Sequence, residues 1–235
     1  TGEVGITAFS VPEGSLDFWA KRLEGQRVAG LSAEERFGEK RLTFLGPDGD
    51  EFALVEVADD ERTPWTTPEV SDQVAIRGFH STSMRLKDEA AMAELMGFMN
   101  YSPVDKQGAI TRIGVEGGNG AHLLDLEVLP SASSSGQGAG SVHHIAFAVE
   151  DRAAQLRVRD ALIDTGYAVT PVIDRDYFWA IYFRTPGGIL FEVATNEPGF
   201  DRDEDLATLG EGLKLPSQHE HLRTRLESLL EPIAD

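Results

Sequence analysis

Five side chains in the C-terminal half of the chain have the types that bind metal ions or handle protons: His143, His144, Arg175, Tyr182 and Glu192. Imidazole and carboxylate groups suit Fe(II), Mn(II) or Zn(II). The chain has no cysteine, so a thiolate ligand, a disulfide and a cysteine nucleophile are excluded. A phenol or a guanidinium near such an ion could orient an anionic substrate. These residue types indicate a metal centre built from His and carboxylate ligands.

The apolar run 141–149 reads as a strand that positions the two histidines. Because side chains alternate across a strand, His143 shares a bulky face with Ile145 and Phe147, and we expect that face to pack in the core. His144 lies on the opposite face with small residues, which leaves room for a bound group.

A second apolar strand over 188–194 carries Glu192. Burying an unpaired carboxylate is costly, and a metal ion held by His144 and Glu192 would satisfy it. A half-exposed glutamate and a buried Glu–Arg pair are the alternatives. Between these strands, residues 174–184 read as another strand, ended by the turn 185–188. Tyr182 can then point into the same hollow if the sheet curls.

These motifs have a recognisable order: His-His on a first strand, then Asp-Arg-Asp-Tyr-Phe, Ile-Tyr-Phe-Arg-Thr-Pro-Gly-Gly and Phe-Glu. In that order they resemble the glyoxalase/bleomycin-resistance/extradiol-dioxygenase (vicinal oxygen chelate) superfamily. The closest likeness is to its ring-cleaving dioxygenases that act on hydroquinones. Pro198-Gly-Phe200 and Leu213-Lys-Leu-Pro216 in the tail look like the same subgroup.

The resemblance implies an α+β fold of repeated βαβββ modules that pair into curled mixed sheets. It also implies Fe(II), or Mn(II), held by two His and one Glu, with His144 and Glu192 as two of the three ligands. Tyr182, Arg175 and His143 match positions around the metal and the ring. The expected reaction inserts both atoms of O₂ into a small aromatic substrate. No segment matches the module that carries the other His, and we expect this module to be missing from the sequence as given.

The same strand–helix–strands pattern recurs along the chain, which indicates an internal repeat. We expect modules over 1–58, 75–130 and 140–196, the first two pairing with each other, and a tail with a helix over 197–235. An acidic linker, 59–72, and a flexible tether, 131–140, separate the modules. Aligning the repeats places His80 at the core-facing His143 position and Asp125 near the Glu192 position. We therefore interpret His80 as structural and do not assign Asp125 as a ligand.

The remaining histidines offer no better ligand. His122 is expected near a turn or the surface. His219 and His221 are two apart on a predicted helix, 217–230, so their side chains would not face each other.

Composition limits the partners. The 235 residues carry 40 acidic against 21 basic side chains, a net charge of −19, which argues against nucleic acid or an anionic membrane. No apolar run reaches membrane-spanning length, and no signal peptide is evident. We expect a cytoplasmic homo-oligomer.

Two alternatives to the dioxygenase stay open. A protein of the same superfamily could bind a ligand without chemistry, and a complete set of metal ligands would distinguish the two. A glyoxalase-type lyase would use Zn(II) or Ni(II) and usually two Glu ligands. The strand positions where a second Glu would be expected hold Ala53 and Asp125, so the lyase ranks third among the three hypotheses.

Overall fold

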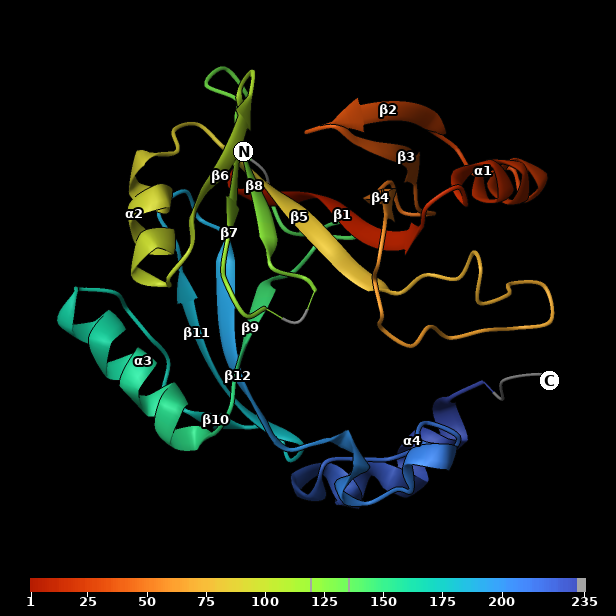
Figure 1. The fold of residues 1–235 in the computed structure, drawn as a ribbon. Coiled ribbons are helices and arrows are strands. Elements are labelled where there is room, and N and C mark those ends of the chain that lie inside the picture. The colour runs from red at the N-terminus through yellow and green to blue at the C-terminus, as the bar shows by residue number, and fades with distance from the viewer. Residues whose placement is uncertain (119, 135, 232–235) are drawn as a thin grey trace. The chain divides into compact units, whose positions relative to one another are not determined.

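The computed structural model describes residues 1–118, 120–134 and 136–231 (Figure 1). The chain forms two compact units. Unit 1 comprises Thr1–His144 with Thr185–Ile189, and unit 2 comprises Ile145–Arg184 with the described residues from Leu190 onward.

Unit 1 is an eight-stranded mixed sheet in the order β2-β3-β4-β1-β5-β8-β7-β6. Each half of this sheet is built from a strand, a helix and three further strands. The two halves join where β1 and β5 pair antiparallel, and within each half the first and last strands pair parallel. The elements are β1 (Glu3–Pro12), α1 (Leu16–Gly25), β2 (Ser32–Arg36), β3 (Glu39–Leu45), β4 (Glu51–Val57), β5 (Gly78–Leu86), α2 (Ala90–Phe98), β6 (Ser102–Gln107), β7 (Ile110–Gly114) and β8 (Leu123–Val128).

Unit 2 repeats the order strand, helix, strands in a smaller sheet, β10-β11-β12-β9. Its first and last strands again pair parallel, with Glu192 opposite Ala146. The elements are β9 (Ile145–Val149), α3 (Arg152–Asp164), β10 (Ile173–Asp174), β11 (Phe178–Arg184) and β12 (Leu190–Pro198). Figure 1 shows the curl of the sheets and the few helices beside them, and the α+β fold class expected from the sequence is confirmed. The division into three modules and a tail stays a prediction.

Alternating apolar residues of the strands supply the core of each unit, as the period of a half-buried strand requires. In unit 1, Ile6 and Ala8 of β1 pack against Ala53 and Val55 of β4. In unit 2, Phe183 and Phe191 lie opposite each other on one face of the sheet, and their rings meet edge to face with centroids 5.8 Å apart.

One polar side chain fixes α3 to the sheet of unit 2. Asp151 caps this helix, its carboxylate accepting from the amide of Ala154 at 2.7 Å. Gln155, which is fully buried, donates to the carbonyl oxygens of Trp179 and Val193 at 2.7 and 2.8 Å. The Gln155 side chain therefore satisfies backbone groups of two strands at once.

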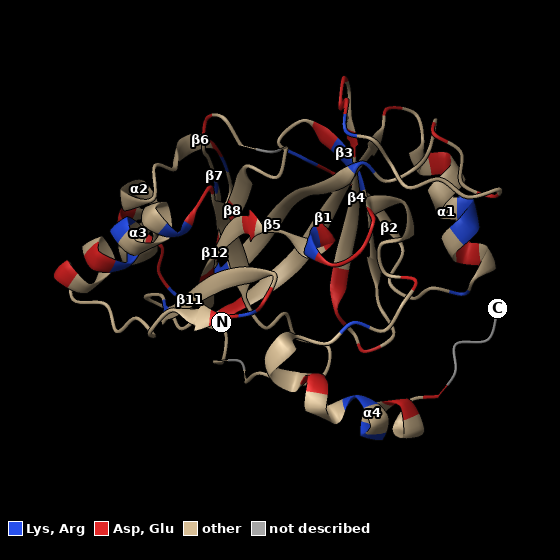
Figure 2. Cartoon of the chain, turned by 90° about the horizontal axis from the view of Figure 1, so that it is seen from below, with Lys and Arg blue, Asp and Glu red and all other residues tan. Residues whose placement is uncertain are grey.

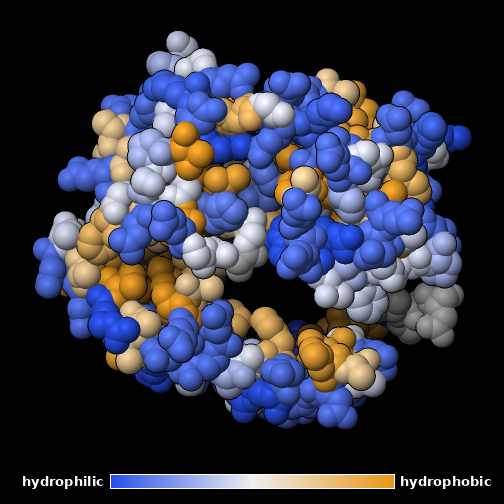
Figure 3. All heavy atoms as spheres, in the orientation of Figure 1, coloured by the Kyte–Doolittle hydropathy of each residue, from blue (hydrophilic) through white to orange (hydrophobic). Residues whose placement is uncertain are grey.

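A tail of short helices follows β12: η1 (Phe200–Arg202), η2 (Leu206–Thr208), η3 (Ser217–Leu222) and α4 (Arg223–Leu229). Its large apolar residues, Leu206, Leu209, Leu213, Leu229 and Leu230, are exposed, and Figure 3 shows apolar atoms among the hydrophilic surface around α4. Polar contacts, described below, attach this tail to the turn between β10 and β11. Figure 2 shows acidic residues at many positions along the ribbon of both units. No helix in the described ranges is long and apolar enough to cross a membrane.

Three local predictions are wrong. β9 begins at Ile145, so His143 and His144 precede the strand, and His143 is exposed rather than in the core. The run 174–184 is broken into β10 and β11 by a turn that contains Arg175. The predicted helix over 217–230 starts as a 3-10 helix.

Candidate functional site

Glu192 lies in the middle of β12 with neighbouring strands on both sides. It pairs with Ala146 of β9 and with Tyr182 of β11, and it is 3% exposed. Residues directly opposite each other in an antiparallel pair project from the same face, so Tyr182 and Glu192 share one face of the sheet. The sheet of unit 2 thus holds a buried carboxylate beside a phenol, as the strand alternation predicts.

Tyr182 connects Glu192 to Arg175. The Arg175 Nη2 lies 3.2 Å from the Tyr182 hydroxyl, and the guanidinium carbon lies 5.5 Å from the Tyr182 ring centroid. The hydroxyl also hydrogen-bonds the Glu192 carboxylate. Since a guanidinium only donates and a carboxylate only accepts, the hydroxyl accepts from Arg175 and donates to Glu192.

This environment keeps the Tyr182 phenol protonated. Burial raises the pKa of Tyr182, and the nearby Glu192 carboxylate adds to that rise, whereas the hydrogen bond from Arg175 opposes it. The net shift is upward from an ordinary value of 10.0. At neutral pH the hydroxyl is therefore a hydrogen-bond donor and not a phenolate base.

His143 and His144 contact each other just before β9. Their Nδ1 atoms are 2.9 Å apart and their rings meet edge to face, with centroids 5.2 Å apart. One Nδ1 must carry a proton and the other must accept it. If the His144 Nδ1 donates, its Nε2 is the unprotonated nitrogen, and an unprotonated nitrogen is the form in which imidazole binds a metal. His143 can therefore orient His144 and set its tautomer.

The imidazole of His144, at the end of unit 1, and the buried carboxylate of Glu192, in unit 2, are each of a type that divalent metals take as ligands. Among the described residues, however, no group of three His, Asp or Glu side chains is arranged to hold an ion. His144 and Glu192 remain the two predicted protein ligands, and no described residue is assigned as a third.

A network of ion pairs lies in the sheet of unit 1. It includes His80 and Asp125, the residues that the repeat aligns with His143 and Glu192. The Glu39 carboxylate lies 3.2 Å from the His80 Nε2 and 2.5 Å from the Arg112 Nη1. Arg112 in turn binds both Asp125 oxygens, at 2.8 and 3.1 Å. Burial raises the pKa of Glu39, but the hydrogen bonds from His80 and Arg112 outweigh it and leave that pKa below the ordinary value. His80 is buried, as predicted, and Asp125 is engaged by an arginine.

More arginines join this network. Arg36 Nη1 lies 3.6 Å from Asp125, and Arg41 Nε lies 3.0 Å from Glu34. Burial, followed by the neighbouring Arg36, lowers the pKa of Arg41 to about 10. Sequence reasoning missed these arginines. Their only trace in the sequence is the mixture of acidic and basic residues along β2 and β3. Such a mixture is also typical of an ordinary solvent-exposed face.

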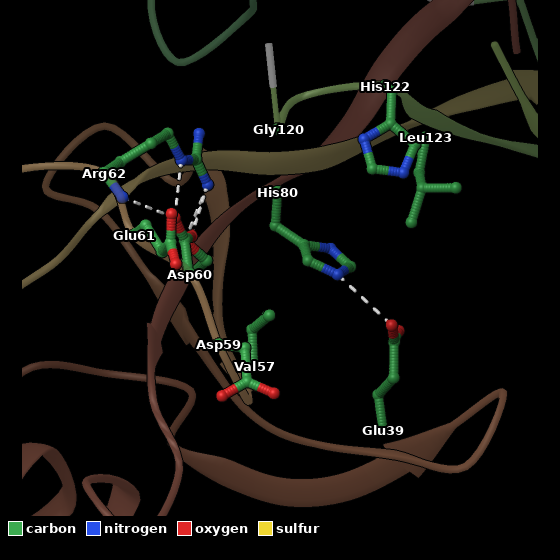
Figure 4. A pocket seen from close by; sticks show the side chains of 11 residues that line it. Glu39, Val57, Asp59, Asp60, Glu61, Arg62, His80, Gly120, His122 and Leu123 are labelled. Carbon is green, nitrogen blue, oxygen red and sulfur yellow. Dashed lines mark hydrogen bonds and ion pairs between the residues drawn. The ribbon is translucent and has the colours of Figure 1, made fainter. Parts of the chain in front are cut away.

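The Glu39–His80 pair lines one side of a pocket of about 590 Å³ (Figure 4). It is lined by Ser10, Glu39, Val57, Asp59, Asp60, Glu61, Arg62, His80, Gly120, His122 and Leu123. Arg62 forms part of the wall and binds Asp60 at 2.7 and 2.9 Å and the carbonyl of Phe79 at 2.8 Å. Gly78 and Gly120 leave room for its guanidinium, since a Cβ on either would lie 2.7 Å from it.

This pocket is poorly suited to the expected chemistry. Four of its lining side chains are carboxylates against one guanidinium, so its field disfavours an anionic phenolate. Glu39 and His80 already bind each other, as Figure 4 shows. His122 borders this pocket. His219 and His221 lie in η3 with ring centroids 6.5 Å apart. Unit 2 remains the better candidate for a catalytic site.

Comparison with known proteins identifies the family. The model of the Glyoxalase/Bleomycin resistance protein/Dioxygenase superfamily matches residues 8–193. The chain is 42% identical to "Putative ring-cleaving dioxygenase MhqO" of Bacillus subtilis over 98% of its own length and 73% of that protein. It is 34% identical to the chlorohydroquinone/hydroquinone 1,2-dioxygenase of Sphingobium indicum over 96% of its length and 72% of that protein. A crystal structure of a "putative dioxygenase" from Bacillus subtilis matches 99% of the chain and 74% of that chain, with a TM-score of 0.92 and 41% identity. The chain therefore belongs to the glyoxalase/bleomycin resistance protein/dioxygenase superfamily.

Proposed function

We propose that the chain acts as a metal-dependent ring-cleaving dioxygenase on hydroquinone- or catechol-type aromatics, with O₂ as co-substrate. The observation that carries the proposal is the series Arg175–Tyr182–Glu192, which links an exposed guanidinium through a protonated phenol to a buried carboxylate. Relatives named as ring-cleaving and hydroquinone dioxygenases, alignable over nearly the whole chain, support it.

In this proposal His144 and Glu192 are two protein ligands of an Fe(II) ion, with Mn(II) as the alternative. A bound ion of this kind would lower the pKa of a coordinated phenol and hold the ring beside O₂. The buried position of Glu192 supports its assignment, because a metal would compensate the cost of burying the carboxylate.

The chain's own groups then orient the ring. Arg175 is exposed, always charged and donor-only, so it can pair with an anionic oxygen of the substrate. The Tyr182 hydroxyl, protonated at neutral pH, can donate a hydrogen bond to a substrate oxygen in place of Glu192 and can act as a general acid during ring opening. His143 holds the His144 ring through the Nδ1 contact and is a second candidate for moving a proton.

Oxygen uptake on a panel of hydroquinones and catechols tests the proposal. Tyr182→Phe should lower turnover about a hundredfold, the size typical for loss of one acid–base group. Tyr167→Phe, a control on another tyrosine of unit 2 that packs against Phe183, should keep the wild-type rate. Equal rates in all three proteins would remove Tyr182 from the mechanism. Binding of the ring without oxygen uptake by wild-type protein that has been supplied with Fe(II) or Mn(II) would instead indicate a non-catalytic binding protein.

A further inference from the structure

The turn that carries Arg175 has an unusual backbone conformation. It joins β10 to β11, and the Arg175 amide donates to the Phe178 carbonyl at 2.9 Å. Asp176 has a φ of 72°, a left-handed conformation that is uncommon outside glycine but is tolerated by aspartate. The Asp176 amide donates to the Asp174 carboxylate at 2.8 Å, which closes the turn locally.

The tail holds the Asp176 carboxylate from two places. Ser217, at the start of η3, donates its amide to Oδ2 at 2.8 Å and its hydroxyl to Oδ1 at 3.0 Å. Arg202, in η1, donates to Oδ1 at 2.7 Å and also to the Asp176 carbonyl. The side chain is 11% exposed despite lying in a surface turn. The Ser217 hydrogen bonds, followed by the Arg202 charge, lower the pKa of Asp176 below its ordinary value, so the carboxylate stays charged at neutral pH.

Neighbouring residues of the turn bind the tail as well. The Asp174 carbonyl accepts from Gln218 at 3.4 Å. Tyr177 stacks on Phe200, with ring centroids 5.5 Å apart and planes 15° apart, and its hydroxyl binds Asp203 at 3.1 Å. Asp174, Asp176 and Tyr177 are thus each attached to the tail, whereas the Arg175 side chain extends to Tyr182.

We propose that Asp176 is a positioning residue for Arg175: by binding Ser217 and Arg202 it fixes the turn so that the Arg175 guanidinium stays on the Tyr182 hydroxyl. The inference rests on the proposed function for its catalytic consequence but not for its structural part. A long arginine side chain on an unrestrained turn samples many rotamers, and each contact with Tyr182 must overcome that entropy. In this proposal the tail is therefore part of the functional site.

Asp176→Gly is the decisive variant, because glycine adopts the left-handed conformation freely and only the tethering carboxylate is lost. Ser217→Ala removes one hydroxyl contact and should give a smaller effect of the same sign. Glu220→Gln is the matched control, since it weakens a tail ion pair, Glu220–Arg223, that does not touch the turn. Arg175→Gln defines the full effect of losing the guanidinium.

The first readout needs no enzymatic activity. The Tyr182 phenol is titrated by ¹³C-tyrosine NMR around the ordinary tyrosine pKa of about 10, with Tyr182→Phe as the assignment and circular dichroism checking that the fold persists. Arg175→Gln should raise the pKa of Tyr182, because the hydrogen bond from Arg175 lowers it. Asp176→Gly should reproduce at least half of that rise, and Glu220→Gln none of it. A wild-type titration in Asp176→Gly, or no shift in Arg175→Gln, would overturn the proposal.

Turnover of a hydroquinone is the second readout. Asp176→Gly should lower kcat/KM about ten- to a hundredfold, the size expected when a substrate-orienting group is misplaced, and Asp176→Asn should recover part of it because its amide oxygen still accepts from Ser217. If the titration shifts as expected but the wild-type protein shows no ring cleavage, the positioning role stands and the proposed function fails. Wild-type kcat/KM in Asp176→Gly, with active wild-type protein, would contradict the positioning role.

Discussion

Replacing Asp125 should destabilise unit 1 far more than replacing any partly exposed acid of the same sheet. The Asp125 and Arg112 side chains are 2% and 4% exposed and form two hydrogen bonds, at 2.8 and 3.1 Å. Removing the carboxylate leaves a buried guanidinium with Glu39 as its remaining acidic partner. Loss of one member of a buried pair typically costs about 3–5 kcal/mol. At about 2–4 °C per kcal/mol for a protein of this size, Tm should fall by about 6–20 °C.

A double-mutant cycle separates this pair energy from general damage. Asp125→Leu and Arg112→Met should each be severe, whereas the double variant should cost less than their sum, because an apolar pair of similar volume replaces two desolvated charges. Glu127→Gln is the control: Glu127 pairs with Arg85 at 3.4 Å, both side chains are more than 20% exposed, and the expected cost is about 0–1 kcal/mol. Urea denaturation followed by circular dichroism provides the free energies. Costs below about 1 kcal/mol for both single variants, or strict additivity, would refute the structural role of the network.

Two further predictions concern stability. Gln155→Met should lower the free energy of unfolding by about 1–3 kcal/mol, because it leaves the carbonyls of Trp179 and Val193 without the side-chain donor. Arg157→Met, on the exposed face of α3, is the control and should change the free energy of unfolding by less than about 0.5 kcal/mol. Equal effects of the two substitutions would contradict the role of Gln155. Because the folded-state pKa of Glu39 lies below the ordinary 4.5, its contribution is present above that pH and is lost as pH falls through the folded-state pKa. The difference in urea midpoint between wild type and Glu39→Gln should therefore shrink on acidification, and a difference that grows towards low pH would show the opposite sign.

The fold and the family could be predicted because both depend on patterns that the chain repeats. Alternating apolar residues indicated β1, β4, β5 and β12, and strand parity correctly placed His80 in the interior. The turns at 46–50 and 185–188 carry Gly and Pro, whose backbone preferences are visible in the sequence.

What failed depends on partners that are distant in the sequence. β2 and β6 are polar, exposed edge strands, so their apolar pattern is absent and only pairing with β3 and β7 reveals them. β9 begins where its pairing with β12 begins, at Ile145 opposite Phe191, and no local propensity marks that limit after His144. The turn at Arg175 lacks Gly and Pro, and its left-handed residue is an aspartate held by Ser217, more than 40 positions away.

Metal stoichiometry tests the central claim, that Glu192 is a metal ligand, most directly. Purified wild-type protein, Glu192→Ala and Glu197→Ala are compared by elemental analysis after reconstitution with Fe(II) or Mn(II). Glu197 is an exposed acid on the same strand and controls for the loss of one charge. Wild type and Glu197→Ala should retain the ion, and Glu192→Ala should lose it while keeping its secondary structure. Full retention of iron or manganese by Glu192→Ala would contradict the assignment.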